Sequence, residues 1–333
     1  MESRESSLHP NEQAASIPNV AHFIWYGRTL PWLHAMSVVT AARAGAFTKL
    51  VLHHEPTLDS QMLARLREVP KVELRVVDPA RAFANFERSQ QLHALYERLT
   101  QPAARANLMR AAVLHAEGGV YLDMDVVTLK SFAPLLNDGV FFGAEPVALP
   151  SALLEKPSLR GYTRAYALMA VRDVLRRAPA GPHWFRHVAR YFTLAANNAI
   201  VGALPGHPFM KSVLNGMLDL PEDKQLRRYA LGTHLLQRTL RASDSQNLVV
   251  HPQAAFYPLG PELSEHWFRL QTRTQPSAVI GPDTYAVHWY ASVRTRHWVE
   301  RMNADFVRKH HGRQLISTLL APHVEHFAES HGL

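Results

Sequence analysis

Two aspartates separated by one residue, Asp123 and Asp125, are the side chains of this 333-residue sequence with the clearest capacity for chemistry. A pair of glycines precedes them at the expected end of a helix, and the apolar residues 120–122 predict a buried strand that leads into the acids. Side chains at positions i and i+2 of an extended chain point to the same face, so both carboxylates can bind one hard cation while Met124 turns into the core. The pattern predicts a Mg²⁺ or Mn²⁺ site completed by water and the phosphate oxygens of a nucleotide diphosphate.

A calcium loop of the EF-hand type does not fit these acids. Such a loop starting at Asp123 would need glycine at its sixth position and glutamate at its twelfth, where the chain has Thr128 and Pro134. A solvated turn is also disfavoured, because apolar residues flank both acids and an unpaired charge inside an apolar strand is costly. We therefore expect the two negative charges to be compensated.

Other catalytic signatures are missing from the sequence. It has no Walker glycine loop, no Gly-x-Gly-x-x-Gly and no Gly-x-Ser-x-Gly, which are the usual marks of nucleotide hydrolysis, dinucleotide redox chemistry and hydrolase elbows. His183 and His187 have the i, i+4 spacing of a zinc helix, but Trp184 occupies the position of the metalloprotease glutamate. A basic helix face is the favoured interpretation there, and the same holds for His323 and His326.

The composition is that of a globular protein with a basic surface. Apolar residues make up 47% of the chain, the formal net charge is +8, and cysteine is absent, which excludes disulfides and thiolate metal sites and fits a cytoplasmic protein. The first sixteen residues contain no apolar core of a secretory signal, and no run of eighteen apolar residues predicts a membrane span.

Arginines are concentrated in two regions, residues 160–190 and 294–313. Solvated helix faces are the favoured interpretation of both. The alternative is a docking surface for an anionic membrane, a lipid-phosphate-linked acceptor or an acidic polymer, which would make the protein peripheral at the inner membrane surface. Nucleic-acid binding is disfavoured, since no recognisable module accompanies the arginines.

Alternating strands and helices at the beginning of the chain predict a parallel sheet with crossover helices, the opening of a nucleotide-binding α/β fold. We expect further helical segments at residues 80–116 and from 150 to about 192, and a helical end from residue 294. The expected strands are residues 20–25, 49–53, 72–77, 120–122, 140–143, 199–202 and 248–251, and the first helices are residues 32–44 and 58–69.

Four segments in this order resemble bacterial glycosyltransferases with the Asp-x-Asp sugar-binding region. That group contains glycosyltransferase family 32 and, more remotely, the large clostridial glucosylating toxins. The segment that ends in Gly-Gly-Val-Tyr-Leu-Asp-Met-Asp is the most specific of the four. They are residues 17–27, 106–125, 197–209 and 285–292.

The resemblance implies a GT-A fold, the Rossmann-like fold of nucleotide-diphospho-sugar transferases, with a mixed sheet flanked by helices. Residues 17–293 would form this domain, with added helical segments at about 80–117 and 150–192. Residues 1–16 would be a flexible N-terminal segment, and residues 294–333 a basic helical C-terminal segment.

The resemblance also implies roles for particular residues. Trp25 would stack on the nucleotide base, with core packing as an equal alternative; Arg110 would approach the donor, with a surface charge as the alternative. The catalytic residues would be Asp123, Asp125 and Arg110, and His288 would join the two aspartates as a metal ligand, or Ser292 would supply that contact. The donor-binding residues would be Phe23, Ile24, Trp25, Asn107, Arg110, Tyr121, Asp123, Asn197, Asn198 and Ser292.

Two positions depart from the family pattern. Relatives usually have an aspartate three residues before the arginine, in contact with the sugar hydroxyls, whereas this chain has Asn107. An amide keeps an acceptor and gains a donor, so the preferred sugar would differ or donor binding would weaken. Relatives commonly have tryptophan after the serine that matches Ser292, but here Val293 follows. Trp289, Tyr290 or Trp298 would take that role.

The function implied is a Mn²⁺- or Mg²⁺-dependent, retaining glycosyltransferase, most simply a hexosyltransferase with a UDP-sugar donor. GDP-sugar remains an alternative donor, and the acceptor is open. Assembly of a bacterial glycan or secondary metabolite is the favoured setting. The alternatives are an effector that modifies a host protein and a non-catalytic protein that binds a sugar nucleotide.

Overall fold

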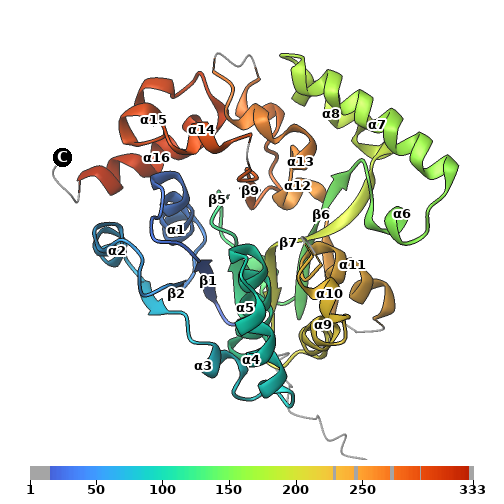
Figure 1. The fold of residues 1–333 in the computed structure, drawn as a ribbon. Coiled ribbons are helices and arrows are strands. Elements are labelled where there is room, and N and C mark those ends of the chain that lie inside the picture. Colours follow the sequence, from blue (N-terminus) through green and yellow to red (C-terminus); the bar gives the residue numbers. More distant parts are fainter. Residues whose placement is uncertain (1–15, 228–229, 244–246, 271–273, 293, 330–333) are drawn as a thin grey trace, which may run out of the picture.

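The computed structural model describes residues 16–227, 230–243, 247–270, 274–292 and 294–329, and its centre is a seven-stranded sheet with helices on both faces (Figure 1). The order across the sheet is β3-β2-β1-β4-β7-β6-β8. Its strands are β1 (Val20–Trp25), β2 (Lys49–His54), β3 (Val72–Val76), β4 (Gly119–Leu122), β6 (Val140–Val147), β7 (Thr193–Ala203) and β8 (Leu248–His251).

The sheet is mixed, as predicted for this α/β class. Strands β3, β2, β1 and β4 are parallel, whereas β7 runs antiparallel to both of its neighbours. Crossover helices α1 (Trp32–Ala44) and α2 (Ser60–Arg67) join the first three strands, and three helices precede β4. Parallel neighbours require such crossovers, which is why the helix–strand alternation could be read from the sequence. These three helices are α3 (Pro79–Phe83), α4 (Ser89–Arg98) and α5 (Pro102–Glu117).

Alternate residues of the central strands pack into two separate hydrophobic cores, one on each side of the sheet. In β4, Val120 and Leu122 belong to one core and Tyr121 to the other, because successive side chains of a strand point to opposite faces. The first core packs against α1 and the C-terminal helices, and the second against α4, α5, α9 (Pro208–Leu218) and α11 (Thr233–Ala242). Figure 1 shows these two groups of helices on opposite sides.

The two aspartates lie in a turn and not in a strand, which corrects the prediction. Strand β4 ends at Leu122, the chain turns through Asp123, Met124 and Asp125, and β5 (Val126–Thr128) begins in a separate sheet. There β5 pairs with β9 (Ala286–His288), with Val126 opposite His288. The amide of Val126 donates to the carbonyl of Asp123 at 3.2 Å, closing the turn. Met124 is buried, as expected.

The remaining helices lie mostly beyond the sheet edge and at the C-terminal end. The segment after β6 is helical, as expected, but β6 extends to Val147 and β7 already begins at Thr193. Residues 1–15, to which a flexible segment was assigned, lie outside the described residues, and the domain division stays a prediction. These helices are α6 (Ser151–Glu155), α7 (Leu159–Arg177), α8 (Gly181–Val188), α10 (Glu222–Gln225), α12 (Gln253–Phe256), α13 (Gly260–Leu263), α14 (Arg296–Val299), α15 (Ala304–His310) and α16 (Leu315–Glu329).

In the part of the chain that the structure describes, every helix is too short or too polar to cross a membrane.

Candidate metal and donor site

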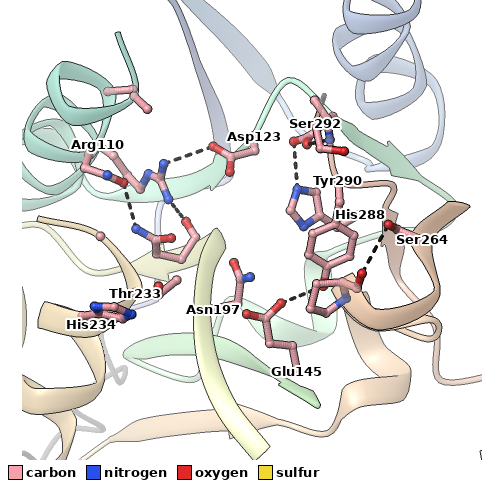
Figure 2. A pocket seen from close by; sticks show the side chains of 18 of the residues that line it. Arg110, Asp123, Glu145, Asn197, Thr233, His234, Ser264, His288, Tyr290 and Ser292 are labelled. Carbon is pink, nitrogen blue, oxygen red and sulfur yellow. Dashed lines mark hydrogen bonds and ion pairs between the residues drawn. The ribbon is translucent and has the colours of Figure 1, made fainter. Parts of the chain in front are cut away.

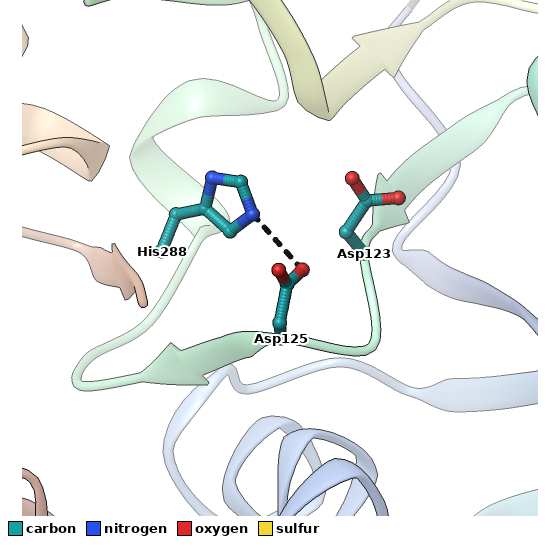
Figure 3. Close-up of side chains that lie close together, drawn as sticks. All are labelled: Asp123, Asp125 and His288. Atoms are coloured by element: carbon teal, nitrogen blue, oxygen red, sulfur yellow. Dashed lines mark ion pairs between the residues drawn. The ribbon is translucent and has the colours of Figure 1, made fainter. Parts of the chain in front are cut away.

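Asp123, Asp125 and His288 form a compact cluster of metal-ligand groups. One ligand atom from each of them lies within 4.8 Å of the others, and Figure 3 shows the two carboxylates and the imidazole pointing toward one another. The Nε2 atom of His288 lies 2.9 Å from Oδ1 of Asp125. The antiparallel pairing of β5 with β9 places His288 next to the turn. The structure thus brings together the three residues that the resemblance implied as metal ligands.

The cluster fits a divalent cation. Nδ1 of His288 is buried without a hydrogen-bond partner among the described residues, and Nε2 has only the carboxylate of Asp125 as its partner. The imidazole therefore has ligand capacity that the protein does not fully use. Two carboxylates and one imidazole suit Mn²⁺ in particular, since Mg²⁺ prefers oxygen ligands alone. In this arrangement Asp123, Asp125 and His288 would hold the cation.

Charges within the cluster oppose the effect of burial. Burial alone would raise the pKa of Asp125, but the neighbouring His288 lowers it below the usual value. Burial alone would lower the pKa of His288, but Asp125 raises it. Burial raises the pKa of Asp123, with Asp125 adding to the shift and Arg110 opposing it. A cation that bound here would therefore displace the proton shared between Asp125 and His288.

Helix α1 holds the turn that carries the aspartates. Nδ1 of His34 and Oγ of Ser37 both donate to the carbonyl oxygen of Met124, each at 2.8 Å. On the other side, the amide of Ala291 donates to Oδ2 of Asp125 at 2.6 Å. Sequence reasoning missed His34 and Ser37. Their only sequence signal is an i, i+3 spacing of polar residues within an apolar helix.

Arg110 on α5 is a buried partner of Asp123 and not a surface charge. Its side chain is 8% exposed, and its Nη2 atom donates to Oδ1 of Asp123 at 3.1 Å. The guanidinium lies 4.3 Å from the centre of the Tyr121 ring, and the Tyr121 hydroxyl donates to the same Asp123 oxygen at 2.8 Å. Arg110 also donates to the carbonyl of Asn198. These contacts compensate the charge of Asp123.

A cavity of about 780 Å³ opens on one side of the cluster. In Figure 2, Arg110, Thr233 and His234 lie on the left of this cavity and His288, Tyr290 and Ser264 on the right. The sequence-predicted residues on its wall are Asn107, Arg110, Asp123, Asp125, Asn197, Asn198, His288 and Ser292.

A second, smaller cavity of about 190 Å³ also borders the aspartates. Its wall is mainly apolar and includes Ile24, Trp25 and Tyr121. Both cavities are lined by Asp123 and Asp125. The two aspartates therefore lie where a small, mainly apolar cavity meets a larger one whose wall carries many polar side chains.

Trp25 is held at the smaller cavity by its neighbours. Its Nε1 donates to the carbonyl of Thr29 at 3.0 Å, and its ring lies 4.9 Å from that of His34, which in turn lies 5.1 Å from the ring of Trp289. Trp25 also packs against the core, so both roles considered for it are compatible with its position. Phe23, in contrast, is completely buried in the core and lines neither cavity.

Asn107 bonds to another predicted donor-binding residue. Its Oδ1 accepts from Nδ2 of Asn198 at 3.0 Å, which joins α5 to β7 across the cavity wall. Asn197 is buried, and its Oδ1 accepts from the amide of Ala199 at 2.7 Å. Ser292 is exposed at the cavity, where its Oγ accepts from the amide of Arg294 at 3.3 Å. The roles of these residues toward a donor stay predictions.

Glu145 and Tyr290 also line the large cavity. Sequence reasoning assigned no role to Glu145 and named Tyr290 only as one of three substitutes for the missing tryptophan. The Tyr290 hydroxyl donates to Oε2 of Glu145 at 2.8 Å, and its ring centre lies 4.0 Å from that of His288. Burial raises the pKa of Glu145, although Tyr290 and Asn197 oppose that shift. The sequence signal that could have identified Glu145 is its position as the single acidic residue in the apolar segment 140–147.

Of the three aromatic residues considered as substitutes for the missing tryptophan, Tyr290 alone lines the large cavity. Trp289 is completely buried, and Trp298 packs on Phe268 with ring centres 6.4 Å apart. Val293 lies outside the described residues. The histidines at positions 183 and 187 are exposed on α8 and do not join a group of metal ligands among the described residues.

Comparison with known proteins finds a match of one segment to a family model and several structural likenesses. Residues 56–142 match the family described as glycosyltransferase sugar-binding region containing DXD motif. This segment includes Arg110, Asp123 and Asp125. No curated protein matches the sequence.

Three solved structures illustrate the structural likenesses. A structure titled PaToxG glycosyltransferase has a TM-score of 0.45 at 15% identity, over 68% of this chain and 70% of that chain. Mouse xyloside xylosyltransferase 1 has a TM-score of 0.46 at 12% identity, over 80% and 96%. The galactosyltransferase LgtC in complex with donor and acceptor sugar analogs has a TM-score of 0.37 at 11% identity, over 82% and 87%.

Proposed function

We propose that this protein, a glycosyltransferase with the DXD sugar-binding region in residues 56–142, is metal-dependent and transfers a sugar from a nucleotide diphosphate to an acceptor hydroxyl. The observation that carries the proposal is the cluster of Asp123, Asp125 and His288, whose two aspartates line both cavities. A nucleotide sugar consists of a flat base with its ribose, then a charged diphosphate, and then the sugar.

The three parts match the site from one end to the other. The aromatic face of Trp25 in the smaller cavity suits a base, for which stacking needs no particular hydrogen bonds. A cation held by the cluster suits the diphosphate. The larger cavity, with the amides of Asn107 and Asn198 on its wall, suits the sugar and the incoming acceptor. We propose UDP-sugar as the donor.

Bond cleavage places negative charge on the departing diphosphate. A bound divalent cation would supply Lewis-acid stabilisation of that charge. Arg110 is a fixed positive charge beside Asp123, in a buried setting where electrostatic interactions are stronger than in water. The contacts of Arg110 with the Tyr121 ring and the Asn198 carbonyl hold it in place before the donor binds.

We propose that the reaction retains the anomeric configuration. The bond from the anomeric carbon to the phosphate oxygen breaks, and the acceptor oxygen forms its new bond from the same face. The acceptor proton passes to the diphosphate oxygen that leaves. This route requires no side-chain nucleophile, and we assign none. The buried Glu145 lies on the cavity wall, where it orients Tyr290 beside His288.

Release of UDP from UDP-sugars tests the proposal. We expect purified protein with Mn²⁺ to release UDP slowly from at least one of UDP-glucose, UDP-galactose and UDP-N-acetylglucosamine, with water as the acceptor. Asp125→Asn and excess EDTA should each abolish the release. Full activity in EDTA would contradict metal dependence.

A non-catalytic sugar-nucleotide sensor is the second candidate function, and Asn107 is the observation that favours it. Its side chain already accepts a hydrogen bond from Asn198, where relatives have a carboxylate. Tight binding of UDP-sugars without any release of UDP would favour the sensor. Calorimetric titration alongside the release assay separates the two functions.

A further inference from the structure

Helices α7 and α8, at the upper right of Figure 1, leave large apolar side chains in contact with solvent. On α7, Leu159 is 87% exposed, Tyr166 65% and Val174 64%. Trp184 on α8, and Tyr191 and Leu194 after it, are each at least half exposed. We call these six residues the outer hairpin surface. Single exposed apolar residues are ordinary, but a group on neighbouring elements marks an interaction site.

The three apolar residues of α7 lie on one side of the helix. Their spacings of seven and eight residues correspond to two helical turns each, so they form a stripe along the helix axis, roughly 22 Å long. The opposite side of α7, with Ala165 and Leu175, is buried against the rest of the protein. Helix α7 therefore already packs on the body of the protein with one side and leaves a second apolar stripe uncovered.

Arginines are frequent on α7 and α8. Two of them, Arg172 and Arg176, are mostly buried and pair with Glu262 and Glu265, and the others remain near the apolar stripe. Residues 159–192 contain seven arginines and a single acidic residue, Asp173, which Arg172 pairs with at 2.9 Å. Arg164 donates to the carbonyl of Tyr191 at 2.7 Å, and the guanidinium of Arg190 lies 5.0 Å from the centre of the Tyr191 ring. The arginines thus continue from α7 to the apolar residues that follow α8.

From this arrangement we propose that the outer hairpin surface docks on an anionic membrane surface. Helices that lie in the membrane interface combine low overall hydrophobicity with an apolar side, flanking arginines and aromatic residues. A second copy of the chain fits less well, because a two-fold contact would bring arginines against arginines. A nucleic acid would leave the apolar stripe exposed. The proposal rests on this surface alone and does not depend on the proposed function.

The hairpin is connected to the wall of the large cavity. Nη1 of Arg172 lies 3.5 Å from Oε2 of Glu262, and Nε of Arg176 donates to the carbonyl of Glu262 at 3.2 Å. The neighbouring Pro261 and Ser264 line the cavity. Docking through α7 and α8 would therefore hold the cavity close to the membrane, which fits an acceptor presented there.

Vesicle flotation tests the proposal with the full chain. We expect the protein to float with vesicles of phosphatidylcholine mixed with phosphatidylglycerol, to dissociate as salt is added, and to stay unbound with pure phosphatidylcholine. No binding to the mixed vesicles at low salt would overturn the proposal, as would equal binding to both kinds of vesicle.

Two sets of substitutions separate the apolar and electrostatic contributions. Leu159→Ser with Tyr166→Ser and Val174→Ser should reduce the bound fraction roughly fivefold or more by removing buried apolar area. Arg160→Gln with Arg186→Gln should remove most of the preference for phosphatidylglycerol. Leu226→Ser with Val250→Ser is the matched control, since these exposed apolar residues lie on other elements and should not matter for binding.

Unchanged circular dichroism and thermal unfolding would show that the variants fold. Wild-type binding by the serine variant would overturn the proposal. Light scattering adds one more outcome: a dimer that the serine substitutions dissociate would show that a second copy covers the surface, and would also overturn it. UDP release in solution should be the same for the serine variant and the wild type, which distinguishes a failure of docking from a failure of the proposed function.

Discussion

Two clusters of polar side chains are buried in the same half of the sheet, and they differ in charge. Between β1 and β2, Nδ1 of His22 lies 3.2 Å from Nε2 of His53, and both side chains are almost completely buried. At the end of β4, Asp123 and Asp125 are joined by His288. Each cluster contains groups that titrate, so burial alone does not distinguish them.

Their pKa shifts do distinguish them. Burial lowers the pKa of His22 to about 4 and that of His53 to about 3, so both are neutral and bond to each other. In the second cluster, burial would lower the pKa of His288 but Asp125 raises it, and Nδ1 of that imidazole lacks a hydrogen bond among the described residues. The two histidines satisfy each other's hydrogen-bonding needs and have a structural role. The second cluster instead holds charged groups and a ring nitrogen free to bind a ligand, which indicates that it is the functional one.

The sharpest test of this difference exchanges one residue in each cluster. Asp125→Asn should lower kcat/KM roughly a thousandfold, because it removes a metal ligand and the partner of His288. His22→Gln should lower stability and leave kcat/KM per folded molecule unchanged. UDP release and urea unfolding measure the two effects. If His22→Gln lost activity while Asp125→Asn remained active, the histidine pair and not the aspartate cluster would be the functional one.

Acid should destabilise the protein through the histidine pair. Well above pH 6.5 the two imidazoles are neutral in both the folded and the unfolded chain, so stability does not depend on pH through them. As the pH falls toward 4, the unfolded chain binds protons that the folded chain excludes, and stability falls by roughly 3 kcal/mol for each histidine. Urea unfolding at pH 7 and pH 5 measures the difference. It should be smaller in His22→Gln; an equal difference would locate the acid sensitivity elsewhere.

Manganese should stabilise the protein through the second cluster alone. At a concentration a hundredfold above its dissociation constant, Mn²⁺ should add about 2.7 kcal/mol. The raised pKa of His288 means that the metal competes with a proton, so the stabilisation should grow from pH 6 to pH 8. Thermal unfolding with and without Mn²⁺ measures it. Asp125→Asn serves as the control, and an equal shift in that variant would place the metal at another site.

Activity should depend on the shape of the Arg110 side chain as well as on its charge. Arg110→Lys should lower kcat/KM about tenfold, because an ammonium cannot bond to Asp123 and the Asn198 carbonyl while it lies over Tyr121. Arg105→Lys is a matched control on the same helix, since Arg105 lies 5.1 Å from the centre of the Tyr96 ring and donates to Leu99 outside the cavities. Equal losses in both variants would indicate a general effect on α5.

The sequence predicted the elements that depend on interactions between residues close together in the chain, and it missed contacts between distant residues. Strands β1 and β8 and helix α1 were predicted with the bounds that the structure shows, because their apolar periodicity is local. The sequence predicts a strand at Asp123 and Asp125, where the structure has a turn. Apolar residues on both sides look like one continuous strand, although they belong to β4 and β5 in two different sheets. His34 and Ser37 were missed because their partner, a backbone carbonyl, has no sequence signal.

By itself the sequence determined the α/β class, the pair of aspartates and the arginine on the preceding helix, since these depend on residues close together in the chain. The tertiary structure decided what surrounds them. The pairing of β5 with β9 brings His288 to the aspartates and Ala291 to Asp125, and both strands are only three residues long. Strands of that length have almost no periodicity of their own, so their pairing is determined by the packing of the folded protein.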